Sequence, residues 1–175
     1  AAVNDRASST NTRTLPSGAV TIEVNFQLSL MNLIVGGTSL TELAVFSRGG
    51  ATRYVTVRAS ASGAGVHAAT SSDGGAEVTT SLSALSLSRL SFEVPHHLMA
   101  VAVPGTSLTL YCDGVLVSSV AIPAGSYAGS DVCAALGGAG ANQAPIGRFG
   151  ELRLSNVARD AAYARTAYAS LRARS

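Results

Sequence analysis

The sequence predicts an all-β protein, a two-sheet antiparallel sandwich that ends in one short C-terminal helix. From Val20 to Leu30, apolar and polar residues alternate without interruption, which is the period of a strand with one face on a core. Glycine- and serine-rich turns separate this strand from other short apolar segments, a spacing typical of antiparallel sandwiches. Helical spacing is confined to residues Asp160 to Ala173, where Asp160 is a suitable N-cap.

The alternation in the first strand determines which of its side chains face the core. Successive side chains of a strand point to opposite faces, so even-numbered residues share one face and odd-numbered residues the other. We expect the apolar set in the core and the polar set exposed or at an interface. The apolar set is Ile22, Val24, Phe26 and Leu28, and the polar set is Glu23, Asn25 and Gln27.

Further strands follow along the chain. Leu98–Val103 is apolar on both faces and is predicted to be a central strand, covered on each side. The dipeptide Asp113-Gly114 predicts a two-residue hairpin turn, whereas residues 126–140 are expected to form a loop around a short apolar run. The other predicted strands are Leu43–Arg48, Arg53–Ala59, Ala76–Leu82, Leu90–Val94, Ser107–Asp113, Val115–Ala121 and Gly147–Asn156.

Two finer expectations concern the C-terminal part of the chain. Helical spacing places Tyr163, Ala167, Tyr168 and Leu171 on one apolar stripe of the predicted helix. Gly150, inside the last predicted strand, permits a bulge or close packing at that position.

The chain divides into a polar arm, residues 1–17, and a single domain, residues 18–175. The arm has two large apolar residues and cannot fold alone, whereas the domain is long enough to bury a core without a disulfide or a metal. Two weak apolar anchors and four polar side chains suit the arm for contact with a partner chain or with its own sandwich. These residues are Val3, Asn4, Arg6, Asn11, Arg13 and Leu15.

Charge and cysteine content exclude several classes of protein. The 12 basic residues are all arginine, and with 10 acidic residues they give a net charge of +2, too small and too scattered for a nucleic-acid-binding surface. No apolar run approaches the roughly 18 residues that span a bilayer. Cys112 and Cys133 form no disulfide framework and are interpreted as small core residues.

Three segments of the sequence resemble one known family. Residues 96–101, HHLMAV, followed by residues 110–114, LYCDG, are similar to the W-H-H-V-A and L-Y-V-D-G pair of laminin-G-like jelly rolls. Residues 146–159 resemble the closing segment of that family, and residues 20–26 its opening strand. The resemblance covers residues 18–172 and implies a jelly roll of the concanavalin A-like lectin and glucanase superfamily. The tryptophans of the family pattern are absent from this sequence.

The residues that carry this resemblance also have structural interpretations. Asp113 and Gly114 suit a turn that needs positive φ at both positions. Tyr111 is expected to pack against the sheet rather than to stack on a sugar. His96 and His97 point to opposite faces of a strand, so at most one of them is expected inside the sandwich.

Recognisable patterns for catalysis and for metal binding are absent. Glucanases of the superfamily carry an E-x-D-x-x-E motif, but here only Asp73 and Glu77 lie within four residues of each other, on either side of a predicted turn. Asp73, Asp131 and Asn142 are isolated, whereas Ca²⁺ takes six to eight oxygen ligands. His67 has no obvious partner. We therefore expect no enzyme activity, no metal and no cofactor.

Three functions remain open on the sequence alone. The resemblance implies a non-catalytic, lectin-like module that recognises a glycan or a partner protein surface. The polar arm favours the alternative of a structural component in a larger particle, such as a virion decoration or fibre protein, held by its arm. The third is a glycoside hydrolase, whose motif is missing. An extracellular surface or a virion is the favoured location.

Overall fold

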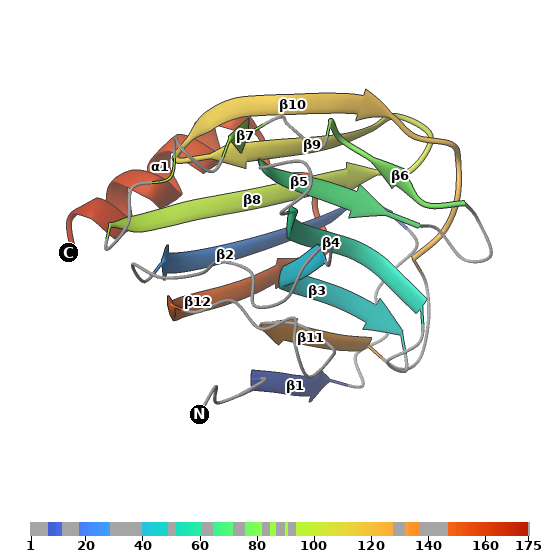
Figure 1. Ribbon diagram of the computed structural model, residues 1–175. Coiled ribbons are helices and arrows are strands. Elements are labelled where there is room, and N and C mark those ends of the chain that lie inside the picture. Colours follow the sequence, from blue (N-terminus) through green and yellow to red (C-terminus); the bar gives the residue numbers. More distant parts are fainter. Residues whose placement is uncertain are drawn as a thin grey trace.

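The protein is a sandwich of two antiparallel β-sheets with one helix outside them (Figure 1). The structure is a computed structural model that describes residues 7–11, 18–28, 40–48, 52–60, 65–71, 76–81, 85–86, 90, 94–127, 132–136 and 147–174. The predicted fold class, an all-β two-sheet sandwich with a short C-terminal helix, is confirmed.

The seven-stranded sheet has the strand order β1-β11-β3-β4-β5-β6, and β7 also pairs with β5. Its strands are β1 (Ala7–Asn11), β3 (Leu40–Arg48), β4 (Thr52–Ser60), β5 (Gly65–Thr70), β6 (Val78–Thr79), β7 (Leu85–Ser86) and β11 (Val132–Leu136).

The five-stranded sheet has the strand order β10-β9-β8-β2-β12. Its strands are β2 (Val20–Leu28), β8 (Pro95–Val103), β9 (Ser107–Cys112), β10 (Val115–Ala121) and β12 (Gly147–Ser155), and the helix that follows is α1 (Ala161–Arg172). No helix in the described part of the chain is both long and apolar enough to cross a membrane.

The core lies between the two sheets and follows the alternation seen in the first strand. Val20, Ile22 and Val24 are fully buried and Phe26 nearly so, which confirms the predicted register of β2. They pack with apolar side chains of both sheets, among them Phe46, Tyr54, Val57, Leu98, Ala100, Leu108 and Leu110. The side chain of Leu28 lies outside the described residues.

Strand β8 is the central strand of its sheet, as its apolar sequence predicts. Leu98, Ala100 and Ala102 enter the core between the sheets, while Met99 and Val101 are buried on the opposite face. Burial on both faces explains why this strand does not alternate in polarity.

The hairpin between β9 and β10 also forms as predicted. Val115 pairs with Cys112, so Asp113 and Gly114 make a two-residue turn with φ of 51° and 78°. A two-residue turn with positive φ at both positions favours Asp-Gly. In β12, the pairing with β2 shifts between Phe149 and Leu152, which confirms the bulge expected at Gly150.

The structure corrects the expected strand pattern in four places. Gly65–Thr70 forms β5, which the sequence did not indicate because all six of its residues are buried and none alternates in polarity. Val132–Leu136 was expected within a loop and is strand β11. A strand was also predicted over Leu90–Val94, but its two end residues lie in bends. The strand predicted over Ala76–Leu82 is shortened to β6.

Part of the polar arm belongs to the chain's own sheet. Residues Ala7–Asn11 form β1, which pairs antiparallel with β11 at one edge of the seven-stranded sheet. The prediction that the arm cannot fold alone fits this arrangement, because β1 gains its backbone hydrogen bonds from a neighbouring strand. Asn11 lies in β1, whereas the predicted arm residues Val3, Asn4, Arg6, Arg13 and Leu15 lie outside the described residues.

Candidate functional site

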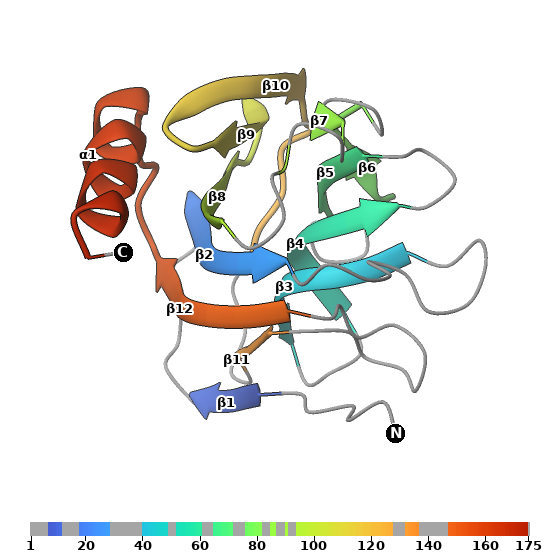
Figure 2. The ribbon, with the colours of Figure 1, turned by 60° about the vertical axis from the view of Figure 1, so that its left-hand side comes forward.

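Helix α1 lies on the outer face of the five-stranded sheet, turned away from the other sheet (Figure 2). Its N-cap is Asp160, as predicted, and the Asp160 carboxylate accepts a hydrogen bond from the Tyr163 N–H at 2.8 Å. The buried Thr21 hydroxyl of β2 donates to the Val157 carbonyl at 2.7 Å and accepts from the Arg159 N–H at 3.2 Å. These bonds hold the segment before α1 on the sheet and so determine where the helix lies.

One part of the interface between α1 and the sheet is apolar. Met99 and Val101 of β8 are buried against Ala164 of the helix, with Tyr111 and Tyr163 packed around them. Tyr111 is therefore a packing residue, as expected. Ala164, rather than the predicted stripe, is the buried residue of α1, because a methyl side chain lets the helix backbone approach the sheet closely.

The rest of this interface is a polar pocket of about 180 Å³, which we call the helix pocket. Its sheet side is formed by Glu23, Asn25, His97, Glu151 and Arg153, and its helix side by Tyr163, Thr166, Ala167, Ser170, Leu171 and Arg174. Three of the four residues predicted for the apolar stripe of the helix thus line a pocket and are half-buried.

The floor of the helix pocket is a buried pair of polar side chains. His97 Nε2 lies 3.2 Å from Glu23 Oε2, and each side chain is only 3% exposed. Asn25 stands next to this pair, because it is the register partner of His97 between β2 and β8. Glu23 was expected to be exposed or at an interface; it is buried because α1 covers this face of the sheet.

The buried pair leaves several polar atoms without partners. Glu23 Oε1, Asn25 Oδ1 and His97 Nδ1 are buried, and none has a hydrogen-bond partner among the described residues. A buried polar atom without a partner costs about 1–3 kcal/mol of desolvation. A ligand that supplies hydrogen bonds to these atoms would recover that free energy.

The wall of the pocket that β12 forms carries an ion pair. Arg153 donates from Nε and Nη2 to the two carboxylate oxygens of Glu151, at 2.7 and 2.8 Å. This hydrogen bonding with Arg153 holds the pKa of Glu151 below its usual range and, with a bond to Tyr163, raises the pKa of Arg153. Both side chains are partly exposed, so this pair forms the rim of the pocket rather than its floor.

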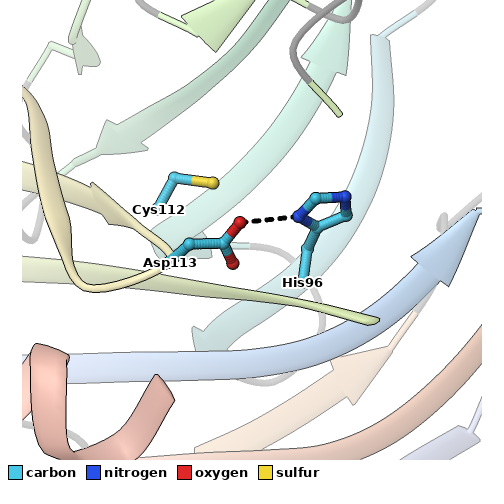
Figure 3. Close-up of side chains that lie close together, drawn as sticks. All are labelled: His96, Cys112 and Asp113. Atoms are coloured by element: carbon cyan, nitrogen blue, oxygen red, sulfur yellow. Dashed lines mark hydrogen bonds and ion pairs between the residues drawn. The ribbon is translucent and has the colours of Figure 1, made fainter. Parts of the chain in front are cut away.

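A second cluster joins the two motifs of the family resemblance. His96 lies in β8, Cys112 ends β9 and Asp113 begins the hairpin turn. The three side chains lie side by side in Figure 3. His96 Nδ1 lies 2.7 Å from Asp113 Oδ2, and the His97 backbone N–H donates to Asp113 Oδ1 at 2.9 Å. The Asp113 N–H in turn donates to the His97 carbonyl at 2.8 Å.

The hydrogen bonds of this second cluster give it a structural role, and its thiol is a poor nucleophile. Burial, together with the neighbouring Asp113 carboxylate, raises the pKa of the Cys112 thiol to about 12, and a thiolate is the form that binds metals and attacks electrophiles. Both Asp113 oxygens already accept hydrogen bonds. The cluster fastens the β9–β10 hairpin to β8. The interpretation of Cys112 as a core residue is confirmed; the side chain of Cys133 lies outside the described residues.

The two adjacent histidines face opposite sides of the five-stranded sheet, as predicted. The His96 ring lies 5.8 Å from the Phe26 ring on the core side, and His97 faces α1. Only one of them was expected to be buried. Both are, because the helix covers the outer face.

His67 lies far from the helix pocket, in the middle of β5. It is fully buried, and neither ring nitrogen has a partner among the described residues. Burial, and then the charge of its register partner Arg58, lowers the pKa of His67. Arg58 is bound to Glu77 by two hydrogen bonds of 2.7 and 2.8 Å, so a buried arginine paired with an exposed carboxylate lies beside a neutral histidine.

Sequence reasoning did not find the helix pocket. The predicted partner-binding residues are in the arm, and the candidate calcium ligands Asp73, Asp131 and Asn142 lie outside the described residues. The one usable signal was the odd-numbered polar set of β2, which places Glu23 and Asn25 on one face. Nothing in the pattern indicated that a helix about 140 residues later covers that face.

No protein-family profile and no curated protein sequence matches this chain, but solved structures do. The binding domain of Paraclostridial Mosquitocidal Protein 1 matches with a TM-score of 0.69 at 13% identity, over 89% of this chain and 38% of that chain. The SAP-like pentraxin from Limulus polyphemus matches with a TM-score of 0.63 at 10% identity, over 91% and 74%. Trypanosoma rangeli sialidase matches with a TM-score of 0.61 at 12% identity, over 88% and 23%.

At these identities the likeness concerns the fold alone. This chain spans less than half of the mosquitocidal binding domain and less than a quarter of the sialidase, but most of the pentraxin. The fold shared with them is the two-sheet antiparallel jelly roll.

Proposed function

We propose that this protein is a non-catalytic, lectin-like binding module that takes up a saccharide in the helix pocket. The observation that carries the proposal is the set of buried, unpartnered polar atoms on the pocket floor, Glu23 Oε1, Asn25 Oδ1 and His97 Nδ1. Clefts with a few convergent polar groups are the usual sites for small ligands. A sugar ring carries several hydroxyl groups and is suited to such a floor.

Two further observations support a saccharide as the ligand. The structural relatives include domains described as binding domains, and the binding domain of botulinum neurotoxin DC, similar at a TM-score of 0.57 and 8% identity, was solved in complex with SialylT. The laminin-G-like segments of the sequence point to the same group of modules. The pocket volume of about 180 Å³ suits one terminal sugar unit rather than a long chain.

The arrangement of carboxylates in the helix pocket favours binding over hydrolysis. A glycosidase needs one carboxyl group with a raised pKa as general acid and a second as nucleophile or base. Glu151 is tied to Arg153, which lowers its pKa, and Glu23 is bound to His97. Glu151 therefore lacks the raised pKa that a general acid requires.

The test uses the full chain, a glycan array and one pocket-filling variant. Ala167 lines the pocket, so Ala167→Phe is expected to abolish binding of the glycans that the unmodified protein retains. Ala169→Phe, on the exposed side of the same helix, is the matched control and should bind normally. Binding that survives Ala167→Phe, or turnover of 4-methylumbelliferyl glycosides by the unmodified protein, would contradict the proposal.

For the arm we propose a second role, contact with a partner protein in a larger assembly. β1 is an edge strand of its sheet within the described residues, and such an edge can accept a further strand by β-augmentation. The predicted arm residues Val3, Asn4, Arg6, Asn11, Arg13 and Leu15 remain candidates for this contact.

A further inference from the structure

We infer that the group entering the helix pocket is a primary ammonium, so that the ligand is an amine-bearing saccharide such as a hexosamine. The inference rests on the proposed function and specifies its ligand. It is carried by the kind of polar atoms that the floor leaves without partners, by their charge, and by the position of the positive groups at the rim.

The floor of the pocket offers hydrogen-bond acceptors. Glu23 Oε1 and Asn25 Oδ1 can only accept hydrogen bonds. His97 Nε2 faces Glu23 Oε2 at 3.2 Å, so Glu23 Oε1 is the carboxylate oxygen that remains without a partner. Glu23 Oε1 and Asn25 Oδ1 therefore call for a ligand group that donates.

A primary ammonium supplies what this floor lacks. It carries three N–H donors and no acceptor, whereas a hydroxyl brings one donor together with lone pairs that need donors of their own. The Glu23 side chain is acidic and only 3% exposed. Hydrogen bonds between charged partners are stronger than neutral ones. An ammonium satisfies the geometry and the charge of Glu23 at the same time.

The positive groups of the pocket do not favour an anionic group on its floor. The Arg153 guanidinium is bound to Glu151 at the rim, and Arg174 is exposed at the C-terminal end of α1. A carboxylated sugar that reached the floor would place its charge against Glu23 and against acceptors that cannot donate, which is costly in a buried site. The pocket therefore distinguishes an amino sugar from a sialic acid.

The test compares matched sugars by isothermal titration calorimetry at a pH where the amine is protonated. We expect methyl β-glucosaminide to bind about tenfold or more tightly than methyl β-glucoside or the N-acetylated glycoside, because one charge-assisted hydrogen bond is lost in each of the latter. N-acetylneuraminic acid is expected not to bind. Glu23→Gln, which keeps the shape of the side chain, should reduce the affinity for the glucosaminide to that for the glucoside.

The control variant is Glu77→Gln, which makes the same change of charge directly before β6 and outside the helix pocket, and it should retain the preference for the amine. If neutral and amino sugars bind equally, and Ala167→Phe still blocks their binding, the inference of an ammonium ligand is wrong while the proposed saccharide binding stands. If no sugar of the set binds, both the inference and the proposed function are wrong. Binding of N-acetylneuraminic acid that is tighter than that of methyl β-glucosaminide would also contradict the proposed ammonium ligand.

Discussion

Asp113 shows how a single residue can serve two purposes. Its backbone adopts the positive φ of a two-residue turn, and its side chain accepts hydrogen bonds from the His96 ring and the His97 N–H. The His pair and the Asp-Gly pair are separate motifs in the sequence, yet they form one network in the structure. The turn requirement was predictable, but the contact with His96 and His97 depends on the pairing of β8 with β9.

His67 provides a prediction about pH at the residue scale. Burial and Arg58 hold its pKa below the usual value of about 6.5, so the unfolded chain takes up a proton at a pH where the folded chain does not. The contribution of His67 to stability is therefore complete above about pH 6.5 and is lost as the pH falls below it, by up to about 1.4 kcal/mol per pH unit.

The measurement is denaturant unfolding of the unmodified protein and of His67→Gln between pH 7.5 and pH 5. His67→Gln leaves every other titratable side chain in place, so the difference between the two curves reports His67. We expect His67→Gln to lose less free energy of unfolding on acidification. Parallel curves for the two proteins would contradict the assigned environment of His67.

At the scale of elements, the contact between the β9–β10 turn and α1 is tested by two glycines. A Cβ at Gly114 would lie 2.9 Å from the Arg165 Cα, and φ at Gly114 is +78°. Gly105 has a similar φ of +73°, but there a Cβ would meet only Ala124 at an ordinary 3.7 Å. Both Gly→Ala changes carry the backbone cost of about 1–2 kcal/mol, and only Gly114→Ala adds a clash with the helix.

We therefore expect Gly114→Ala to lower the free energy of unfolding clearly more than Gly105→Ala, measured by urea unfolding at one temperature. Gly114→Ala is also expected to weaken sugar binding, because α1 forms one wall of the helix pocket. Equal destabilisation by the two substitutions would show that the helix does not press on the turn.

The sequence predicted those elements whose local pattern is sufficient to define them. Strand β2 alternates, the β9–β10 turn has Asp-Gly, the bulge has Gly150, and α1 is capped by Asp160. Strand β5 was missed because it is buried on both faces and contains His67 among small residues. The helix pocket was missed because polar residues on a strand face, such as Glu23, look the same in sequence whether they face water or a helix.

At the scale of the whole molecule, β1 connects the arm to the sandwich. Its pairing with β11 predicts that deletion of residues 1–12 exposes the edge of β11 and lowers the stability of the protein. If the arm also contacts a partner, assembly is lost while the truncated sandwich remains folded. Circular dichroism and sedimentation of the full-length and the truncated protein separate these two effects. Unchanged stability together with unchanged association would contradict both the stabilising role of β1 and the partner contact of the arm.

The central claim is that the helix pocket binds a saccharide, and the most direct measurement is a ¹H–¹⁵N NMR titration of the full chain with a glucosamine trimer and a glucose trimer. The account predicts amide shifts that cluster around Asn25 and His97 on the sheet and around Thr166 and Ser170 on α1, with larger changes for the glucosamine trimer. Shifts that cluster on another face of the sandwich, or no shifts at saturating concentrations of either sugar, would contradict it.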